Sequence, residues 1–355
     1  MRTYLLPEKG RFYKANLHTH TTVSDGIMTP AELKEHYKSQ GYSIIAYTDH
    51  ELIVDHSDLA DEDFLPITGV EYAVLEPREY ISAKTIELNL YAREPHNVGH
   101  VCFDKETVIH GEKWRADSVE LAGPPCKKVF DMAFIQHVID EANKYGFLVC
   151  LNHPAYSMVS PEEFGDFRGL FAMEIFNSCS LYGIGVEEYN PAMYDWMLRH
   201  GKMLHCIAAD DTHTKNGPDE IGHCFRGWCM LKLEKLDYSS AIAALEKGDF
   251  YASTGPDIHS LYVENGKVTI TCSPAKMIKM ATKFRFGKIA VAPKGQYLTE
   301  ANFPMPERDE YMRFEVVDEQ GHHANTNAYP IATNGNIQFM LSLRHWRGRV
   351  QSSHV

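Results

Sequence analysis

Short apolar runs alternate with amphipathic stretches over the first two thirds of the chain. Apolar runs that turn polar at their end, such as "YSIIAYTDH" at 42–50 and "FLVCLNHP" at 147–154, are typical of buried strands. The stretches 29–41 and 128–146 instead carry the spacing of helices with one apolar face. This alternation predicts an α/β fold built on a parallel sheet or barrel.

The first of these helices has clear start and stop signals. Thr29 stands at the N-cap position, Pro30 at the first helical position and Glu32 two residues later, which together form a capping box. Gly41 follows the last helical residue. We therefore expect a helix that begins at Pro30.

The pattern changes near residue 256, and long helical stretches disappear. The segments 260–273, with Asn265-Gly266 at its centre, and 312–326 both have the pattern of β-hairpins. We therefore predict one domain over 1–255 and a small β-sandwich-like domain with a basic tail over 256–355.

Residues 94–127 lack periodicity and are interpreted as an insertion in the first domain. Within that domain, polar positions alternate with apolar ones over 84–94, as in a half-buried strand.

Composition limits the class of protein. The chain has 355 residues, 44% of them hydrophobic, and a net charge of −13, so a sizeable core is expected and extended nucleic-acid binding is disfavoured. No signal peptide and no apolar run of about 20 residues is found, so we expect no membrane span. Eight scattered cysteines without a C-x-x-C pair indicate reduced thiols and a cytoplasmic protein. Nothing in the sequence excludes a homo-oligomer.

Imidazoles and carboxylates gather where the predicted strands end. Because the carboxyl ends of parallel strands converge on one face, residues far apart in sequence are expected to meet there. Imidazole with carboxylate is the ligand mixture of catalytic Zn²⁺, Mn²⁺ or Fe²⁺ rather than of a structural zinc site. Eight such side chains are present, whereas one catalytic zinc takes roughly three protein ligands. This number favours two or three ions. The eight side chains are His18, His20, Asp49, His50, Glu71, His153, Asp211 and His213.

Five motifs, "NLHTHTTVSDG", "YTDHE", "GVEY", "NHP" and "DDTH", resemble in order and spacing those of the PHP (polymerase and histidinol phosphatase) family over roughly 12–255. The segment from "GDFYASTGP" onward more loosely resembles the CehA/McbA-like metallohydrolases. The resemblance implies a distorted (β/α)7 TIM-like barrel with a cluster of two or three divalent ions, Mn, Fe or Zn, at its mouth.

The resemblance also implies a role for each ligand. His18, His20, Glu71 and Asp211 would hold a first metal, and Asp25, His50 and His213 a second. Glu71 and His153 would share a third, where the family often adds a histidine from a strand such as 84–94. This chain has Asn89 there, with Glu87 on the same strand face, so the third site departs from the pattern.

Other polar residues have open roles. Asp49 is interpreted as a residue that orients a ligand rather than binding metal directly. Glu174 either lines the pocket or forms structural hydrogen bonds, and Lys215 is either a phosphate-binding cation or a solvated lysine. His96, His100 and His110 are interpreted as loop residues, one of which could complete the third site.

The leading functional hypothesis is a phosphoesterase that cleaves a small phosphorylated substrate, of nucleotide or sugar phosphate type, with a metal-bound hydroxide. The general acid is unidentified. A 5′-3′ exonuclease or nucleoside-bisphosphate phosphatase is a specific version of this hypothesis. Hydrolysis of a carboxylic ester or carbamate, and a non-catalytic metal-binding module, are the alternatives.

Overall fold

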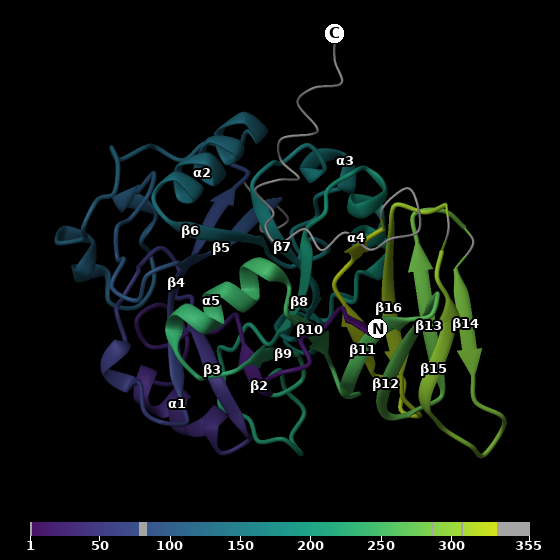
Figure 1. Ribbon diagram of the computed structural model, residues 1–355. Coiled ribbons are helices and arrows are strands. Elements are labelled where there is room, and N and C mark those ends of the chain that lie inside the picture. Colours follow the sequence, from purple (N-terminus) through teal and green to yellow (C-terminus); the bar gives the residue numbers. More distant parts are fainter. Residues whose placement is uncertain (1, 78–83, 286, 307, 332–355) are drawn as a thin grey trace, which may run out of the picture. The chain divides into compact units, whose positions relative to one another are not determined.

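The computed structural model describes residues 2–77, 84–285, 287–306 and 308–331 (Figure 1). The chain divides into two compact units, each treated separately. The α/β unit comprises residues 13–229 and 236–239, and the β unit comprises residues 1–12, 230–235 and those from 240 onward. Residues 2–12, 230–235 and 240–255 thus belong with the β unit, whereas the sequence pattern places the division near 256. The basic tail lies outside the described residues.

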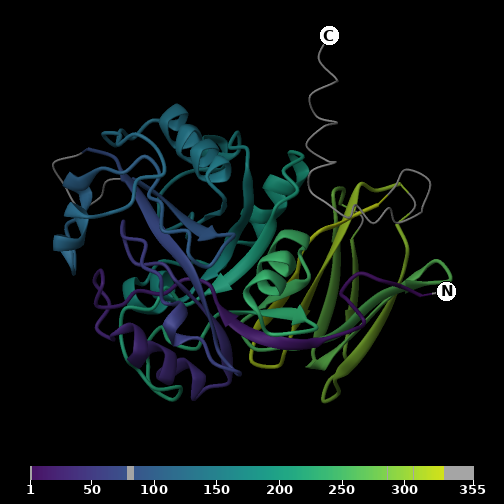
Figure 2. The ribbon, with the colours of Figure 1, turned by 60° about the vertical axis from the view of Figure 1, so that its left-hand side comes forward.

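In the described residues of the α/β unit there are seven strands, β2 to β8, and four helices, α1 to α4. Strand β2 and helix α1 come first in the chain (Figures 1 and 2). The strands are β2 (Arg11–Asn16), β3 (Tyr42–Tyr47), β4 (Leu65–Leu75), β5 (Thr85–Ala92), β6 (Phe147–Leu151), β7 (Leu170–Asn177) and β8 (His205–Ala209). The helices are α1 (Pro30–Lys38), α2 (Met132–Lys144), α3 (Pro161–Phe164) and α4 (Pro191–Arg199). The mixed α/β class expected from the sequence is confirmed.

The strands β2 to β8 lie side by side in chain order. Four of the six pairings are parallel, and an isolated bridge between Thr19 and Thr212 joins the segments that follow β2 and β8. Among the described residues this bridge takes the place of a regular β8–β2 ladder, so a closed barrel is not seen. Since β2 and β8 end together, the residues after them meet at one end of the sheet.

Strand β5 differs from the expectation in direction and burial. It runs antiparallel to both β4 and β6, and nearly all its residues are buried. The predicted alternation of polar and apolar residues is present, but the polar positions do not face water. The carboxylate of Glu87 instead contacts His153, so the half-buried interpretation was wrong.

Helix α1 confirms the capping prediction. Thr29 and Glu32 form the reciprocal hydrogen bonds of a capping box, and Pro30 is the first helical residue. Leu33 and Tyr37 on its inner face pack with buried side chains from β3, which anchors the helix to the sheet. The segment between β2 and α1 is thereby held at both ends.

The β unit consists of two antiparallel sheets. One has the order β1-β11-β12-β15 and the other the path β14-β13-β16-β17-β10, with β18 paired to β16. The hairpin turn at Asn265-Gly266 confirms the sequence prediction, since both residues have the positive φ that such a turn requires. Apolar side chains from both sheets form one core, as in a sandwich. The elements are β1 (Thr3–Tyr4), β9 (Trp228–Leu233), α5 (Tyr238–Lys247), β10 (Phe250–Ser253), β11 (Ile258–Glu264), β12 (Lys267–Ala275), β13 (Met277–Thr282), β14 (Lys288–Val291), β15 (Leu298–Pro304), β16 (Tyr311–Val317), β17 (His323–Thr326) and β18 (Tyr329–Pro330).

The insertion at 94–127 contains only two 3₁₀ turns, Lys105–Thr107 and Lys113–Asp117. Phe103, Val108 and Ala116 in this insertion share a small apolar cluster with Val23 and Leu52. The insertion therefore packs against the segments that follow β2 and β3. No helix in the described part of the chain is long and apolar enough to cross a bilayer.

Candidate metal centre

Most of the candidate ligands stand just beyond the ends of parallel strands. His18 and His20 follow β2, His50 follows β3, and His153 follows β6. Asp211 and His213 follow β8. Glu71 is different, because β4 continues beyond it to Leu75, whereas the sequence pattern ends the strand at this glutamate.

The first cluster consists of His18, His20, Glu71 and Asp211, whose candidate ligand atoms lie within 4.8 Å of one another. The Nε2 atom of His20 lies 3.0 Å from Asp211 Oδ1 and 3.2 Å from Glu71 Oε2. The Nε2 atoms of His18 and His20 are only 3.2 Å apart. All four side chains are buried, so four potential ligands are aimed at one point that is shielded from water.

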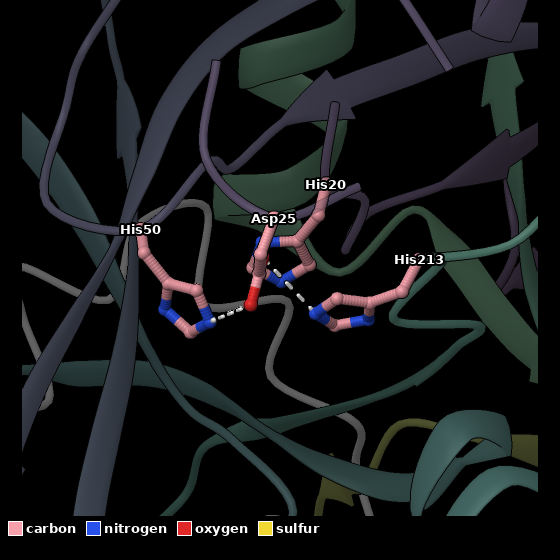
Figure 3. A group of neighbouring side chains, drawn as sticks. All are labelled: His20, Asp25, His50 and His213. Carbon is pink, nitrogen blue, oxygen red and sulfur yellow. Dashed lines mark ion pairs between the residues drawn. The ribbon is translucent and has the colours of Figure 1, made fainter. Parts of the chain in front are cut away.

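The second cluster consists of His20, Asp25, His50 and His213, again within 4.8 Å. Figure 3 shows the three imidazoles around the carboxylate of Asp25. His213 Nε2 lies 3.4 Å from Asp25 Oδ1, and His50 Nε2 lies 3.7 Å from Asp25 Oδ2. The side chains of His50, Asp25 and His213 are 20%, 29% and 25% exposed, so this cluster forms the accessible side of the site.

Glu71 lies between the two clusters. Its Oε1 atom is 3.2 Å from His18 Nε2, and its Oε2 atom is 3.2 Å from both His20 Nε2 and His50 Nδ1. The two oxygens of one carboxylate thus face different sets of imidazoles. A carboxylate placed in this way could contribute one oxygen to each of two ions.

A third group of ligands surrounds His153. Its Nε2 atom lies 3.3 Å from Glu71 Oε1 and 3.1 Å from Glu87 Oε2. Asn89 is buried and stands opposite Glu71 in the β4–β5 ladder. The strand β5 therefore brings the carboxylate of Glu87, two residues before Asn89, to the group around His153.

Burial and neighbouring charge act in opposite directions on these side chains. Burial raises the pKa of Glu71, but the charges of His18 and His50 outweigh it and hold that pKa well below the usual range. Burial likewise lowers the pKa of His213, but its hydrogen bond to Asp25 raises the pKa to about 12. Neighbouring carboxylates also raise the pKa of His18 well above its usual value, so His18 and His213 retain protons when no cation is bound. A metal must displace those protons, so its binding weakens as the pH falls.

The oxygen Oδ1 of Asp211 is buried, and His20 Nε2 and His18 Nε2 lie 3.0 and 3.3 Å from it. Glu71 and Asp211 form no ion pair with lysine or arginine in the described part of the chain; their charged neighbours are histidines. A cation could replace the histidine protons between these buried carboxylates, so the donor set fits a metal ion. Imidazole nitrogens with carboxylate oxygens suit Zn²⁺, Mn²⁺ or Fe²⁺.

Glu174 sits inside β7 and orients His18. Its Oε1 atom accepts a hydrogen bond from His18 Nδ1 at 2.8 Å, and its Oε2 atom accepts from His153 N and Asn177 Nδ2. With Nδ1 carrying the proton, the lone pair of His18 Nε2 faces the first cluster. These contacts favour the structural interpretation of Glu174 over direct ligation.

The substitution Glu174→Gln is expected to weaken metal binding about 10–100-fold. A glutamine amide cannot accept hydrogen bonds on both sides, so either His18 or the His153–Asn177 pair faces another donor. The metal dissociation constant, measured by competition with a chromogenic chelator, checks this. Glu162→Gln, at an exposed position on α3, is the matched control. An unchanged constant for Glu174→Gln would remove the orienting role.

Asp49 shapes the loop that carries Asp25. Its Oδ1 atom accepts hydrogen bonds from Thr21 N at 2.7 Å and Ser24 Oγ at 2.8 Å, and its Oδ2 atom accepts from Thr21 Oγ1. Both oxygens are occupied by loop donors. These contacts fix the loop next to Asp25, and the orienting role of Asp49 stays a prediction.

Lys215 and the insertion histidines lie at the edge of the site or away from it. Lys215 is exposed, and its charge acts on Glu32 and His36. His96 pairs with Asp55, and His100 Nε2 accepts a hydrogen bond from a backbone N–H. His110 is exposed, and its ring centre lies 6.0 Å from that of His50. Of the three insertion histidines, His110 therefore borders the second cluster.

Three further residues contact the ligands and were missed by sequence reasoning. Asn152 donates to Glu71 Oε1 at 2.7 Å, and its place beside His153 in the "NHP" motif was the available signal. Cys179 Sγ lies 3.9 Å from His213 Nδ1. His223 Nε2 accepts a hydrogen bond from the backbone N–H of His213, and burial lowers the pKa of His223 to about 4. No spacing pattern in the sequence indicates Cys179 or His223.

No family model matches the chain. A curated relative, a 5′-3′ exoribonuclease from Haemophilus influenzae, is 39% identical over 62 residues. That match covers 16% of this chain and 23% of the relative.

Solved structures show distant likeness. A two-domain protein from Bacteroides vulgatus, described as containing a predicted PHP-like metal-dependent phosphoesterase, is 15% identical, with a TM-score of 0.46 over 92% of this chain and 97% of that chain. An amidohydrolase from Chromobacterium violaceum with bound sulfate is 14% identical, with a TM-score of 0.39 over 59% of this chain and 89% of the other. We therefore base function on the ligand geometry.

Proposed function

We propose that this protein is a metal-dependent hydrolase, a phosphoesterase of the PHP type that acts on a small phosphorylated substrate. One observation carries the proposal: a buried cluster and a partly exposed cluster of imidazoles and carboxylates share His20 and flank the two oxygens of Glu71. Such an arrangement suits two adjacent Mn, Fe or Zn ions, and His153 with Glu87 offers part of a third site. The proposal includes a seven-stranded barrel formed by β2 to β8.

The ions would activate a water molecule and neutralise charge on the transferring phosphoryl group. The protein side chains hold and orient them. Glu71 spans the clusters, and Glu174 fixes the ring nitrogen that His18 presents. The first cluster is buried and the second is partly exposed, so the substrate would approach past Asp25, His50 and His213.

The charge of the protein favours a small substrate over a long polymer. The net charge of −13 repels phosphate backbones, and Lys215 stands on the surface beside α1. The 62-residue likeness to an exoribonuclease favours a nucleotide-type substrate, with release of terminal nucleotides as the second candidate activity. The eight free cysteines support the cytoplasmic localisation that is part of the proposal.

The candidate centre of the purified protein is expected to bind about two equivalents of Mn, Fe or Zn, and the protein is expected to lose hydrolysis on chelation. Elemental analysis before and after chelation, followed by reconstitution with each metal, measures both quantities. Protein that contains no transition metal and takes up none on reconstitution would contradict the proposal.

A substrate panel tests the reaction class. Phosphomonoesters, phosphodiesters, single-stranded oligonucleotides, aryl esters and carbamates are offered to the same metal-loaded preparation. We expect turnover of small phosphoesters, and the variant Asp211→Asn controls for a contaminating phosphatase. Turnover of the carbonyl substrates alone would assign an esterase or carbamate hydrolase, and no turnover by fully metal-loaded protein would favour a binding module.

A further inference from the structure

A second group of possible metal ligands lies in the α/β unit but includes none of the residues of the candidate centre. The thiols of Cys102 and Cys126 and a ring nitrogen of His137 lie within 4.8 Å of one another. The two cysteines belong to the insertion and its end, and His137 is on α2. The three residues come from segments that are separate in sequence, so the fold brings them together.

The backbone holds the two thiols in place. Cys126 N donates to Phe103 O at 3.0 Å, and the hydroxyl of Tyr72 donates to Cys102 O at 2.8 Å. Cys102 itself has φ of 47°, in the left-handed region that residues other than glycine rarely adopt. The turn that presents Cys102 is thus a constrained conformation, held by neighbouring strands and loops.

Charged side chains of both signs act on the Cys102 thiol. Burial and the nearby Cys126 raise the pKa of the Cys102 thiol to about 12, and the charge of Lys128 acts in the opposite direction. The charge of Glu141 acts on the same thiol, and Glu141 stands one helical turn after His137 on α2. His137 is exposed, so the group has an entry path from solvent.

We propose that Cys102, Cys126 and His137 form a structural zinc site that fastens the insertion to α2. Two thiolates and one imidazole are preferred zinc ligands, and ligand atoms around one tetrahedral zinc ion lie roughly 3.5–3.8 Å apart. The three atoms here lie within 4.8 Å of one another, so an approach of about 1 Å would bring them to that spacing. Zn²⁺ replaces the two thiol protons, which pass to solvent, and binds the neutral imidazole. Water or Glu141 completes the tetrahedron. The insertion has little regular structure, so a metal that joins its end to a helix would supply order that its own hydrogen bonds do not.

Cobalt substitution distinguishes this site from the candidate centre. The full chain is reduced, stripped of metal and loaded with Co²⁺, and the near-ultraviolet thiolate-to-cobalt charge-transfer band is recorded. We expect the band in the unaltered protein and in Asp211→Asn. We expect its loss in Cys126→Ser, together with one equivalent less bound cobalt. His137→Ala changes an exposed residue, so it keeps the test valid if Cys126→Ser fails to fold, and it should weaken the band.

Cys179→Ser is the matched control, because Cys179 is the thiol beside His213 of the candidate centre. The band should persist in this variant. The proposal would be overturned if the unaltered protein showed no band. It would also be overturned if the band disappeared in Cys179→Ser but persisted in Cys126→Ser. A disulfide between Cys102 and Cys126 in protein isolated from cytosol, detected by native mass and thiol count, would also overturn the proposal. These readouts need no substrate, so they stand or fall separately from the proposed hydrolase activity.

Discussion

Asp211→Asn is expected to reduce hydrolysis by more than about 100-fold while the protein stays folded. Asparagine has the same shape as aspartate but carries no charge, so it is a poor ligand for a transition metal. Asp211 Oδ1 lies 3.0 Å from His20 and 3.3 Å from His18, at the centre of the first cluster. Loss of an orienting residue around a metal already costs about 10–100-fold, and loss of a direct ligand should cost more.

Turnover of the best substrate in the panel and metal content are measured on the same preparation of Asp211→Asn. The control is Asp219→Asn, which removes one negative charge at an exposed position a few residues away. We expect the control to match the unaltered protein in both measurements. Asp211→Asn with full activity and full metal content would show that the first cluster is not the reaction centre.

The sequence was sufficient to predict which side chains meet. His18, His50, His153 and Asp211 each follow a short apolar run, and the topology of parallel strands brings such positions to one end of a sheet. The hairpin at Asn265-Gly266 was predictable for a local reason, since the turn needs residues that tolerate positive φ.

Other features depend on contacts that no local pattern records. The alternation in β5 cannot distinguish a strand that faces water from one whose polar face meets other polar side chains, so the contact of Glu87 with His153 was not foreseen. The length of β4 beyond Glu71 follows from pairing with β5, a partner that local sequence does not specify. The proximity of Cys102 and His137 likewise requires the insertion to fold back onto α2.

Asp210, next to Asp211, accepts hydrogen bonds from several parts of the fold. Its carboxylate is fully buried and accepts hydrogen bonds from Asn16, from Tyr37 and from the three backbone N–H groups of residues 225–227. These donors come from the end of β2, from α1 and from the turn before β9. One side chain therefore joins three segments around the end of β8.

The turn at 225–227 depends on this carboxylate. Phe225 has φ of 66°, an unfavourable conformation for a large side chain, and its N–H lies 2.7 Å from Asp210 Oδ2. The N–H groups of Arg226 and Gly227 each lie 2.8 Å from Asp210 Oδ1. Successive N–H groups that converge in this way form a concave anion-binding turn, and here a side chain of the same protein fills it.

Asp210→Asn is accordingly expected to destabilise the fold by about 3 kcal/mol or more. The amide group must direct its N–H₂ toward either Phe225 or the Arg226–Gly227 pair, and a buried donor left without an acceptor costs about 1–3 kcal/mol. This is a large part of the roughly 5–15 kcal/mol that stabilises a typical domain. The melting temperature of the α/β unit should fall by about 6–12 °C, measured by scanning calorimetry on metal-free protein.

Asp211→Asn is the informative comparison, because the two aspartates are adjacent and the substitutions are chemically identical. In metal-free protein Asp211→Asn removes the charge that faces His18 and His20, but these histidines can release protons in response. Asp211→Asn should therefore lower the melting temperature by less than Asp210→Asn. Asp210→Asn should lose stability but, below its melting temperature, still bind metal, because all four residues of the first cluster remain. If Asp210→Asn melts normally, the hydrogen-bonded turn at 225–227 does not support the end of β8. If it is stable but metal-free, Asp210 belongs to the metal centre rather than to the scaffold that holds it.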